Sequence, residues 1–366
     1  MKVLHVVGSR AGFFRISPVF RALRAAGADH QVIVYAGHRE DLVPRDVFLK
    51  ELELPPPNHV LGVSTGSSAI QTGRSLIALE SIVVRESPDW IFAVGDFDAA
   101  LAAALVGRKN GVPLAHLEAG LRAGNSHEAV EINRLLTDRL SDALFVAERE
   151  TCDHLAEEGI DASRIHFVGN TVADTVSRLR GRSSTLELPA LMGLEEEAYV
   201  VALLTRTDVV PGAAPQDEFL EALGGVAFET GRSTILVMDS SSAASVREQR
   251  LEHLLDPMTV VHSPSYVELI ALVEGAGVAV TNACEVLDCA SVLGVPSIAI
   301  GDFAVGRTGI RERSRHISVD QLPQLPEAVI RVLTEHRAPP LPERWDGQAA
   351  QRIAEITMAR LLASVA

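Results

Sequence analysis

The sequence predicts an α/β protein built from two doubly wound, Rossmann-like domains. Short apolar runs alternate with longer segments of helical period from the first residue onward, and this rhythm begins again in the second half of the chain. Apolar runs without polar alternation are typical of parallel strands that helices cover on both faces. With 366 residues, 47% of them hydrophobic, the chain is long enough to build two cores.

In the first half, each predicted strand is a short apolar run followed by a turn and then by a segment of helical period. The strands are Leu4–Val7, Gln31–Tyr35, Trp90–Val94, Leu114–Leu117 and Ala143–Val146. Two of the segments that follow, Pro18–Ala26 and Ala99–Asn110, are predicted helices. The Ser17–Pro18 step is typical of a helix start, with serine as the N-cap and proline at the first helical position.

The second half repeats the pattern after Leu179–Pro189, a polar stretch with the composition of a linker. Its predicted strands are Tyr199–Thr205, Ser233–Met238, Met258–His262, Val278–Thr281 and Ser297–Ile300, and its predicted helices include Asp217–Glu229, Tyr266–Glu274 and Val286–Leu293. We therefore predict an N-terminal domain over 1–178, a C-terminal domain over 190–345, and a last helix within 346–366 that packs back on the first domain. Ligands of open α/β sheets bind beyond the carboxyl ends of the strands, so we expect the active site in a cleft between the domains.

Charge and composition argue against several classes of protein. The formal net charge of −15 argues against nucleic acid as a partner, because such binding depends on clustered Lys and Arg. No apolar stretch reaches the ~20 residues that span a membrane, and the first residues lack a signal-peptide layout. Three cysteines without paired metal spacing favour a reduced, cytoplasmic protein. The chain shows no Walker loop, no G-x-G-x-x-G and no metal motif such as H-E-x-x-H, so we expect neither a cofactor nor a metal.

The first predicted strand leads into the small-residue segment GSRAG at residues 8–12. Small residues let backbone N–H groups approach an anion, and Arg10 adds a charge-assisted hydrogen bond to a phosphate or carboxylate. A tight turn between a strand and a helix also needs glycine. The segment therefore fits an anion site and a purely structural turn equally well.

Carboxylates follow the third and fourth predicted strands. Asp96 is a candidate general base or sugar-hydroxyl ligand, and its alternative role is the N-cap of the next helix, to which Asp98 is closer. Alternation along the fourth strand sends His116 and Glu118 to one face. A carboxylate beside an apolar strand must be paired or have a raised pKa, as an acid/base residue requires.

Two further patterns involve charged residues. A salt bridge from Glu118 to Arg122 or Arg134 is the structural alternative to catalysis. Glu128, Glu131 and Arg134 recur every three residues on a predicted helix, so they share a face, which is either part of the site or a solvated stripe.

The loops after the strands of the second half are acidic. Only Arg206 and Arg307 suit a phosphate, whereas five carboxylates would repel one: Asp208, Asp239, Glu285, Asp288 and Asp302. Glu285 and Asp288 also begin a predicted helix, where their charges satisfy the N-terminal dipole that an anion would otherwise use. This lining is unfavourable for a diphosphate.

Taken together, these segments resemble the UDP-N-acetylglucosamine 2-epimerase family, whose fold is the two-domain GT-B type. GSRAGFFRISP is similar to the family's opening GTRPEAIKMAP, and VGDFDAALAAALVGRKNGVPLAHLEAGLRAG is similar to its GDTTTTLAASLAA…IPVGHVEAGLRTG. NRLLTDRLSDALFVAERET and GNTVADTV follow its NRxLTDxLSDxLFAPTET and GNTVxD. The resemblance covers most of the chain and is most specific up to about residue 176.

The resemblance implies an isomerase in which a carboxylate removes the C2 proton of a sugar nucleotide while UDP is eliminated, giving a glycal. UDP is then added again after reprotonation on the other face, or water is added in the hydrolysing branch. Arg10, Asp96, Glu118 and Arg134 carry over, with Arg15 where the family has Lys. Asp96 and Glu118 become acid/base candidates at C2 and Arg10 an anion contact, and the resemblance also implies a homodimer.

Three family motifs are altered in this chain. PEEANR becomes AVEINR, so its first Glu falls on Val130 and leaves Glu131 or Glu128 as the stand-in. THRRENFG becomes TRTDVV from Thr205, and DSGGIQEE becomes Asn282–Cys289. Each lost charge-assisted hydrogen bond costs ~1.5–3 kcal/mol, so three would weaken UDP binding by roughly 10³-fold or more.

We therefore predict a divergent 2-epimerase-like enzyme that acts on a sugar or sugar nucleotide. A GT-B glycosyltransferase and a non-catalytic homologue that binds a small molecule or a protein are the alternatives. The predicted catalytic residues are Asp96, Glu118 and Glu131, and the predicted substrate-binding residues are Arg10, Arg15, His116, Arg134, Arg206, Glu285 and Arg307.

Overall fold

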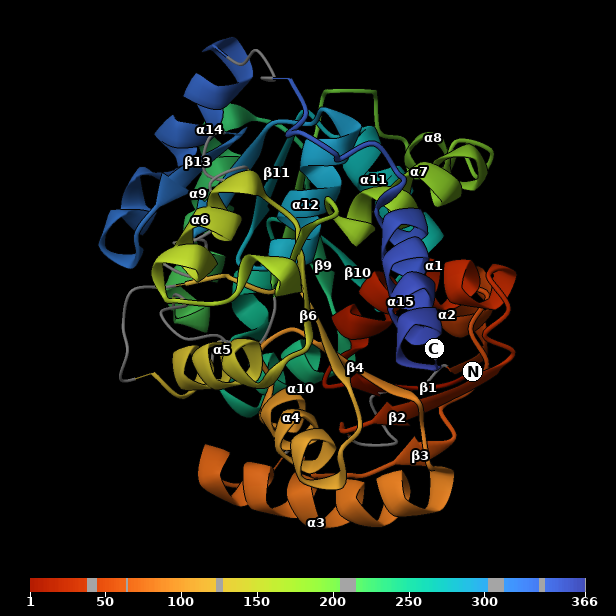
Figure 1. Ribbon diagram of the computed structural model, residues 1–366. Coiled ribbons are helices and arrows are strands. Elements are labelled where there is room, and N and C mark those ends of the chain that lie inside the picture. The colour runs from red at the N-terminus through yellow and green to blue at the C-terminus, as the bar shows by residue number, and fades with distance from the viewer. Residues whose placement is uncertain are drawn as a thin grey trace. The chain divides into compact units, whose positions relative to one another are not determined.

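The computed structural model describes residues 1–37, 45–63, 65–122, 128–204, 215–301, 313–335 and 340–365. The chain divides into two compact units (Figure 1). Unit 1 comprises residues 1–175 and 342–366, and unit 2 comprises residues 176–341. Along the chain, unit 2 is therefore inserted between two parts of unit 1.

Unit 1 contains a seven-stranded sheet in which every strand pair is parallel. Its order is β3-β2-β1-β4-β5-β6-β7, so the chain reverses its direction of growth between β1 and β4, as in doubly wound sheets. The strands are β1 (Lys2–Val7), β2 (His30–Tyr35), β3 (His59–Val60), β4 (Trp90–Val94), β5 (Leu114–Leu117), β6 (Ala143–Val146) and β7 (Ile165–Phe167). The five predicted strands are confirmed, and the short strands β3 and β7 were not predicted.

Helices cover both faces of this sheet because successive side chains of each strand point to opposite sides. Leu4 and Val6 of β1 pack in a core with α3 and α4, whereas His5 lies against Phe20 of α1. The last helix, α15, contacts α1 on that second face (Figure 1). The helices are α1 (Arg10–Ala25), α2 (Arg45–Glu51), α3 (Ser68–Glu86), α4 (Asp98–Asn110), α5 (Ala129–Leu140), α6 (Arg149–Glu157) and α15 (Ala349–Val365). Helix α7 (Thr171–Ser183) begins in unit 1 and continues into unit 2.

Helix α1 begins at Arg10, so the predicted helix start at Ser17 and Pro18 is wrong. The N-cap is Ser9, whose side chain accepts a hydrogen bond from the backbone N–H of Gly12. Pro18 instead lies inside the helix. The GSRAG segment therefore forms the cap and first turn of a helix.

A tertiary hydrogen bond compensates for proline inside α1. Pro18 has no N–H, so the carbonyl oxygen of Phe14, four residues earlier, loses its usual helical donor. The hydroxyl of Thr175 in α7 donates to that oxygen at 2.8 Å. Thr175, which is distant in the sequence, thus allows Pro18 to lie inside the helix, whereas the local sequence predicts a helix start there.

Unit 2 repeats the architecture with a six-stranded parallel sheet of order β10-β9-β8-β11-β12-β13. Its strands are β8 (Val200–Leu204), β9 (Thr234–Met238), β10 (Thr259–His262), β11 (Val278–Thr281), β12 (Ser297–Ile300) and β13 (Ser314–Ile317). Its helices are α8 (Leu188–Leu191), α9 (Gln216–Thr230), α10 (Ser240–Glu248), α11 (Tyr266–Glu274), α12 (Cys284–Leu293) and α14 (Leu325–Glu335). The predicted α/β class with parallel sheets is confirmed in both units.

The predicted linker Leu179–Pro189 is largely helical, which corrects its assignment as irregular chain. Helix α7 continues to Ser183, and α8 begins at Leu188. Leu179 is fully buried, and Arg180 pairs with Glu274 of α11 at 2.7 Å. Arg180 and Arg182 of this stretch therefore belong to a packed helix, and only residues 184–187 connect the two helices.

Among the described residues, no helix has both the length and the apolar character needed to cross a membrane. Cys152, Cys284 and Cys289 are free thiols. Burial raises the pKa of Cys152 and of Cys289, which disfavours a reactive thiolate at either position.

Candidate functional site

Two predicted catalytic carboxylates follow neighbouring parallel strands. β4 pairs with β5, Asp96 comes two residues after β4, and Glu118 comes directly after β5. Glu118 has a φ of +63°, a left-handed conformation that costs a non-glycine residue about 1–3 kcal/mol. Backbone strain of this kind is concentrated at functional positions, so the ends of β4 and β5 form the centre of the candidate site.

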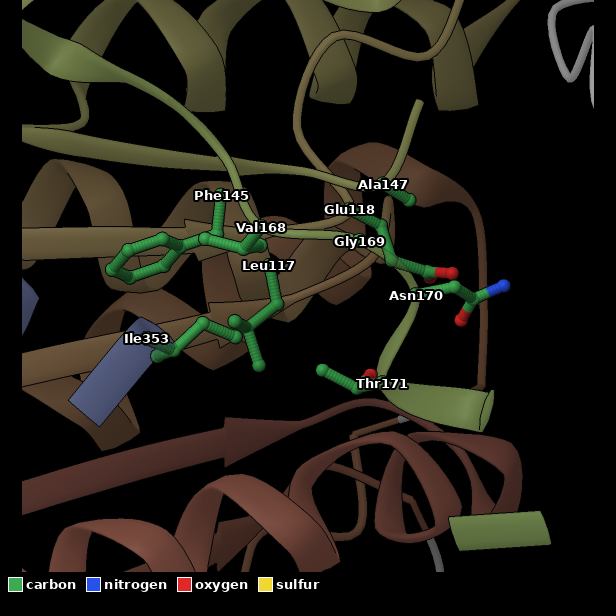
Figure 2. Close-up of a pocket in the computed structure, with 9 residues that line it drawn as sticks. All are labelled: Leu117, Glu118, Phe145, Ala147, Val168, Gly169, Asn170, Thr171 and Ile353. Atoms are coloured by element: carbon green, nitrogen blue, oxygen red, sulfur yellow. The ribbon is translucent and has the colours of Figure 1, made fainter. Parts of the chain in front are cut away.

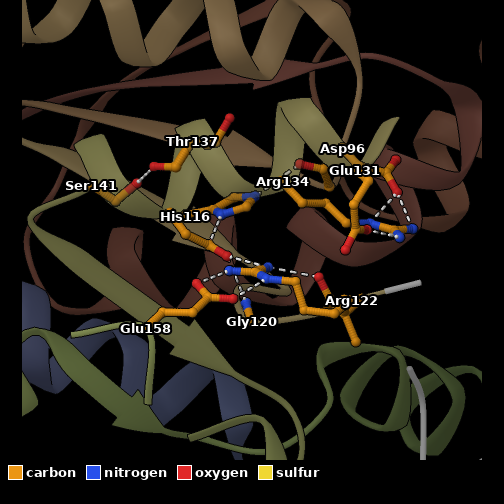
Figure 3. A network of polar contacts seen from close by, with 12 residues as sticks. Asp96, His116, Gly120, Arg122, Glu131, Arg134, Thr137, Ser141 and Glu158 are labelled. Carbon is orange, nitrogen blue, oxygen red and sulfur yellow. Dashed lines mark hydrogen bonds and ion pairs between the residues drawn. The ribbon is translucent and has the colours of Figure 1, made fainter. Parts of the chain in front are cut away.

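Arg134 of α5 contacts two of the three predicted catalytic carboxylates, Asp96 and Glu131 (Figure 3). Its Nη2 and Nε lie 2.6 and 3.0 Å from Oδ2 of Asp96, and its Nη1 lies 3.1 Å from Oε2 of Glu131. Burial of the guanidinium opposes its charge, but the two carboxylates outweigh this effect and raise the pKa of Arg134. The structure therefore brings Asp96, Glu131 and Arg134 together in one group.

Glu118 pairs with Arg15 of α1, at 2.7 Å between Nε of Arg15 and Oε2 of Glu118. The two side chains are 9% and 11% exposed, so this is a largely desolvated ion pair that retains some access to solvent. The sequence alternative of a salt bridge to Arg122 or Arg134 is wrong in its partner, because those arginines pair elsewhere. The arginine in the family's lysine position therefore contacts the carboxylate at the end of β5.

His116 is buried, and both of its ring nitrogens bind protein groups instead of facing solvent. Its Nδ1 lies 2.6 Å from Oδ1 of Asp138, and its Nε2 lies 2.8 Å from the carbonyl oxygen of Gly95. A carbonyl oxygen accepts only, and Asp138 also accepts from Arg122 and from the N–H of Gly120. Both ring nitrogens therefore donate, which requires the imidazolium form.

The electrostatics agree with this assignment. Burial works against both charges, but Asp138 raises the pKa of His116, and His116 and Arg122 lower the pKa of Asp138. A hydrogen bond from His116 to a substrate would require breaking one of its present bonds. His116 therefore holds the chain after the two strands in place. It binds Gly95 directly and Gly120 through Asp138.

Packing explains the glycines of the GSRAG segment. A Cβ at Gly8 would lie 2.4 Å from the ring of Phe97, and a Cβ at Gly12 would lie 2.6 Å from Cγ1 of Val7. Arg10 is the first residue of α1, and its guanidinium lies 4.8 Å from the ring centre of Phe48. The structural requirement for glycine is thus established, and the anion role of Arg10 stays a prediction.

Asp98 anchors the loop after β4 instead of capping α4. Its Oδ1 accepts hydrogen bonds from the hydroxyls of Ser68 and Thr72 at 2.5 and 3.0 Å, and from Nδ2 of Asn133 at 3.2 Å. Asn133 also donates to the carbonyl oxygen of Asp96 at 3.1 Å. The alternative role of Asp96 as the helix cap is wrong, since Phe97 precedes the first helical residue and Asp96 pairs with Arg134.

The predicted residues of unit 2 are described only in part. Arg206 and Arg307 lie outside the described residues. Glu285 is half-buried in the first turn of α12, in agreement with the predicted interaction with the helix dipole. Asp288 is fully buried one turn later, which corrects its placement at the helix start.

A small cavity lies next to Glu118 in unit 1 (Figure 2). Its volume is about 10 Å³, and most of its wall is apolar, with Glu118, Asn170 and Thr171 as the polar side chains. Asn170 directly precedes α7. Sequence reasoning missed Asn170 as it missed Asp138, although GNT before a helical segment is the pattern of an N-cap.

Two units, each with a parallel, doubly wound sheet, define the class of the protein: α/β proteins with paired Rossmann-like units. The family model for UDP-N-acetylglucosamine 2-epimerase matches residues 21–358. The chain belongs to this family.

Individual relatives agree with this membership. The chain is 29% identical over 305 residues to UDP-2,3-diacetamido-2,3-dideoxy-D-glucuronate 2-epimerase of Pseudomonas aeruginosa, covering 82% of this chain and 84% of that protein. It is also 29% identical over 308 residues to UDP-N-acetylglucosamine 2-epimerase of Methanocaldococcus jannaschii, with the same two coverages. The crystal structure of the Methanocaldococcus jannaschii enzyme in complex with UDP-GlcNAc and UDP matches with a TM-score of 0.86 at 24% identity, over 98% of this chain and 100% of that one. These comparisons favour the epimerase prediction over the glycosyltransferase and the non-catalytic homologue.

Proposed function

We propose that this chain is a 2-epimerase that acts on a UDP-sugar with an acetamido group at C2. The observation that carries the proposal is the geometry at the ends of β4 and β5. There, Asp96 and Glu131 share Arg134, and Glu118, in strained backbone, pairs with Arg15. Carboxylates in a partly desolvated site with fixed cationic partners are suited to proton transfer at a carbon next to a leaving group.

In the proposed reaction, one of these carboxylates removes the C2 proton. The electron pair of the C2–H bond becomes the second bond between C1 and C2, and UDP leaves with the electron pair of the C1–O bond. A carboxylate on the other face returns a proton to C2, and UDP adds again at C1. We assign the two proton transfers to Asp96 and Glu118, with Glu131 as the third candidate.

The arginines and His116 support this chemistry in different ways, and His116 does so by holding the carbonyl oxygen of Gly95. Arg134 and Arg15 hold the carboxylates in place through the contacts described above. Arg10, at the start of α1, is the proposed contact for an anionic part of the substrate. Arg206, Arg307 and Glu285 of unit 2 are proposed to contact the nucleotide side.

The relatives leave two substrates as the first to test. One similar enzyme is named for UDP-N-acetylglucosamine, and the other for UDP-2,3-diacetamido-2,3-dideoxy-D-glucuronate. Both contain a UDP leaving group and a C2 acetamido group, the features that the proposed reaction needs. The altered loops of unit 2 are the part of the chain in which the choice between such substrates is proposed to lie.

We further propose a cytoplasmic homodimer. Helix α3 exposes Ile70, Ile77 and Val84, which recur every seven residues and therefore form one apolar stripe. The free cysteines are consistent with a reducing compartment.

The test is proton NMR in D2O with UDP-GlcNAc, UDP-ManNAc and the diacetamido glucuronate, following the C2 and anomeric signals. We expect loss of the C2 proton signal and appearance of the C2 epimer. Asp96→Asn and Glu118→Gln should each reduce the rate by about 10²–10⁴-fold, because each removes a group assigned to proton transfer.

Charge-matched controls are available on the exposed surface of α6. Asp153→Asn and Glu157→Gln remove the same charges from exposed positions and should leave the rate unchanged. Full turnover by Asp96→Asn and Glu118→Gln would contradict the assigned roles. Unchanged spectra of all three sugars with the wild-type protein would contradict the proposed function.

A further inference from the structure

The cavity beside Glu118 contains an amide that uses only part of its hydrogen-bonding capacity. Asn170 is 2% exposed, and its Oδ1 accepts a hydrogen bond from the N–H of Val172 at 2.9 Å. This bond fixes the amide with its oxygen toward the first turn of α7. Among the described residues, nothing accepts a hydrogen bond from the buried Nδ2, and such a donor is costly to leave unsatisfied.

The cavity beside this donor has room for one water molecule. Its volume of about 10 Å³ is near the smallest that admits one water molecule. Glu118 lines the same cavity, and Figure 2 shows its carboxylate on the same side as the Asn170 amide. A water molecule between them would accept from Nδ2 and donate to the carboxylate, and these are the polar partners that a buried water requires.

We propose that Asn170 is a positioning residue for Glu118 and acts through one water molecule in this cavity. The inference rests on the proposed function only in taking Glu118 as an acid/base carboxylate. The terminal torsion of a glutamate is broad, so each group that engages the carboxylate restricts the orientation of its plane. Arg15 forms an ion pair with Oε2 of Glu118 at 2.7 Å, and the water engages the carboxylate from the cavity side. The water thereby adds a restraint on the plane of the carboxylate from the direction of the cavity.

The rest of unit 1 braces Asn170 in this position. Gly169 has a φ of +94°, and a Cβ there would lie 2.0 Å from the carbonyl oxygen of Arg344. Arg352 of α15 donates to the carbonyl oxygen of Val168 at 2.8 Å. The loop that carries Asn170 is therefore held on both sides by the returning C-terminal segment, as a positioning role requires.

Two substitutions separate positioning from helix capping. Asn170→Asp and Asn170→Ser both keep an oxygen that caps α7, and both residues are as good N-caps as asparagine. A residue that only caps the helix therefore tolerates both changes. A positioning residue tolerates neither, because both remove the Nδ2 donor.

For turnover of the UDP-sugar, we expect kcat to fall by about 10- to 100-fold in both variants, with KM little changed. In Asn170→Asp, a second carboxylate faces Glu118, so the acid limb of the kcat/KM profile should move to higher pH by about one unit. Asn170→Ser should lose rate without that displacement. The control is Asp161→Asn, which exchanges a carboxylate and an amide at an exposed N-cap whose Oδ1 accepts from the N–H of Ser163. This variant should leave kcat and the pH profile of kcat/KM unchanged.

A second measurement needs no substrate. At pH 8, Asn170→Asp should lower the Tm by at least about 3 °C, and adding Glu118→Gln should remove most of this loss, because only one of the two facing carboxylates then remains. If wild-type protein turns over no sugar nucleotide, the proposed function fails, and this coupling still decides whether the two side chains interact. Wild-type kcat in both variants, together with no coupling of the Tm values, would overturn the role of Asn170.

Discussion

Two histidines on β1 and β5, the strands on either side of β4 in unit 1, show how partners, and not burial alone, decide the charge of a side chain. His5 of β1 is fully buried with one hydrogen-bond partner, Gln31, and burial lowers its pKa to about 4. His116 of β5 is as deeply buried, yet Asp138 and the carbonyl of Gly95 hold it in the charged form. The first histidine is a packing residue, and the second is part of an ion pair beneath the candidate site.

A third buried group makes unit 1 sensitive to pH. Asp174 of α7 accepts hydrogen bonds from the N–H groups of Ala349 and Ala350 at 3.2 and 2.9 Å, at the start of α15. Burial outweighs these bonds and raises the pKa of Asp174 from 3.8 to about 6. The folded state therefore binds this proton more tightly than the unfolded chain, and the stability it provides is complete below about pH 4 and is lost as the pH rises through 6.

We expect Asp174→Asn, which does not titrate, to lack this dependence. Between pH 4 and pH 7 the unfolding free energy of wild type should fall relative to that of the variant by about 2 kcal/mol. Both tryptophans, Trp90 and Trp345, belong to unit 1, so tryptophan fluorescence during urea unfolding reports this unit. A difference between the two proteins that stays constant over this pH range would contradict the prediction.

For single residues, the sequence predicts the candidate site residues better than it predicts the residues that pair with them. Asp96 and Glu118 could be found because polar residues directly after buried parallel strands meet at one edge of a sheet. The pairing of Glu118 with Arg15, 103 positions earlier in the numbering, depends on how α1 packs, so no local pattern indicates it. The same holds for Asp138 of α5, whose hydrogen bond with His116 depends on how α5 packs against β5.

At the scale of elements, apolar patterning predicted the strands well and the helix ends less well. β4, β5, β6, β11 and β12 have the predicted bounds. The strands β3, β7 and β13 lie at sheet edges. β3 and β7 have only two and three residues, and β13, with the sequence SRHI, is not an apolar run. The start of α1 was misplaced because Pro18 is tolerated there only through a tertiary contact, the hydrogen bond from Thr175.

That contact gives a prediction for helix packing. Thr175→Val keeps the shape of the side chain but leaves the carbonyl oxygen of Phe14 without its main donor, so unit 1 should lose about 1–3 kcal/mol of stability. Thr137→Val is the matched control, since Thr137 is equally buried and its hydroxyl has no hydrogen-bond partner among the described residues. Equal urea midpoints for Thr175→Val and wild type would show that Pro18 needs no such compensation.

At the scale of the whole molecule, the apolar stripe on α3 is the surface on which the homodimer proposal rests. Ile77 at its centre is 75% exposed, and α3 covers α4 with its other side (Figure 1). Exposed side chains of this kind at regular spacing mark association surfaces more often than isolated ones do.

Ile77→Glu should therefore convert a dimer to a monomer, measured as molar mass by light scattering during gel filtration. Phe228→Glu is the control, because Phe228 of α9 is 89% exposed but belongs to unit 2 and is not part of the stripe. A monomeric wild-type protein would contradict the homodimer, and a dimeric Ile77→Glu variant would place the interface elsewhere.

The insertion of unit 2 within unit 1 has a consequence for how the protein is made. The ribosome releases the seven strands of unit 1 first, then the whole of unit 2, and only afterwards α15, which packs against α1. During that interval Asp174 has not yet met the N–H groups of Ala349 and Ala350, and the apolar face of α1 that receives α15 is open to water. Domains generally fold as units during synthesis. Here the first unit is completed last, so a nascent chain stalled in unit 2 presents an exposed apolar helix face that chaperones bind and that the finished protein conceals.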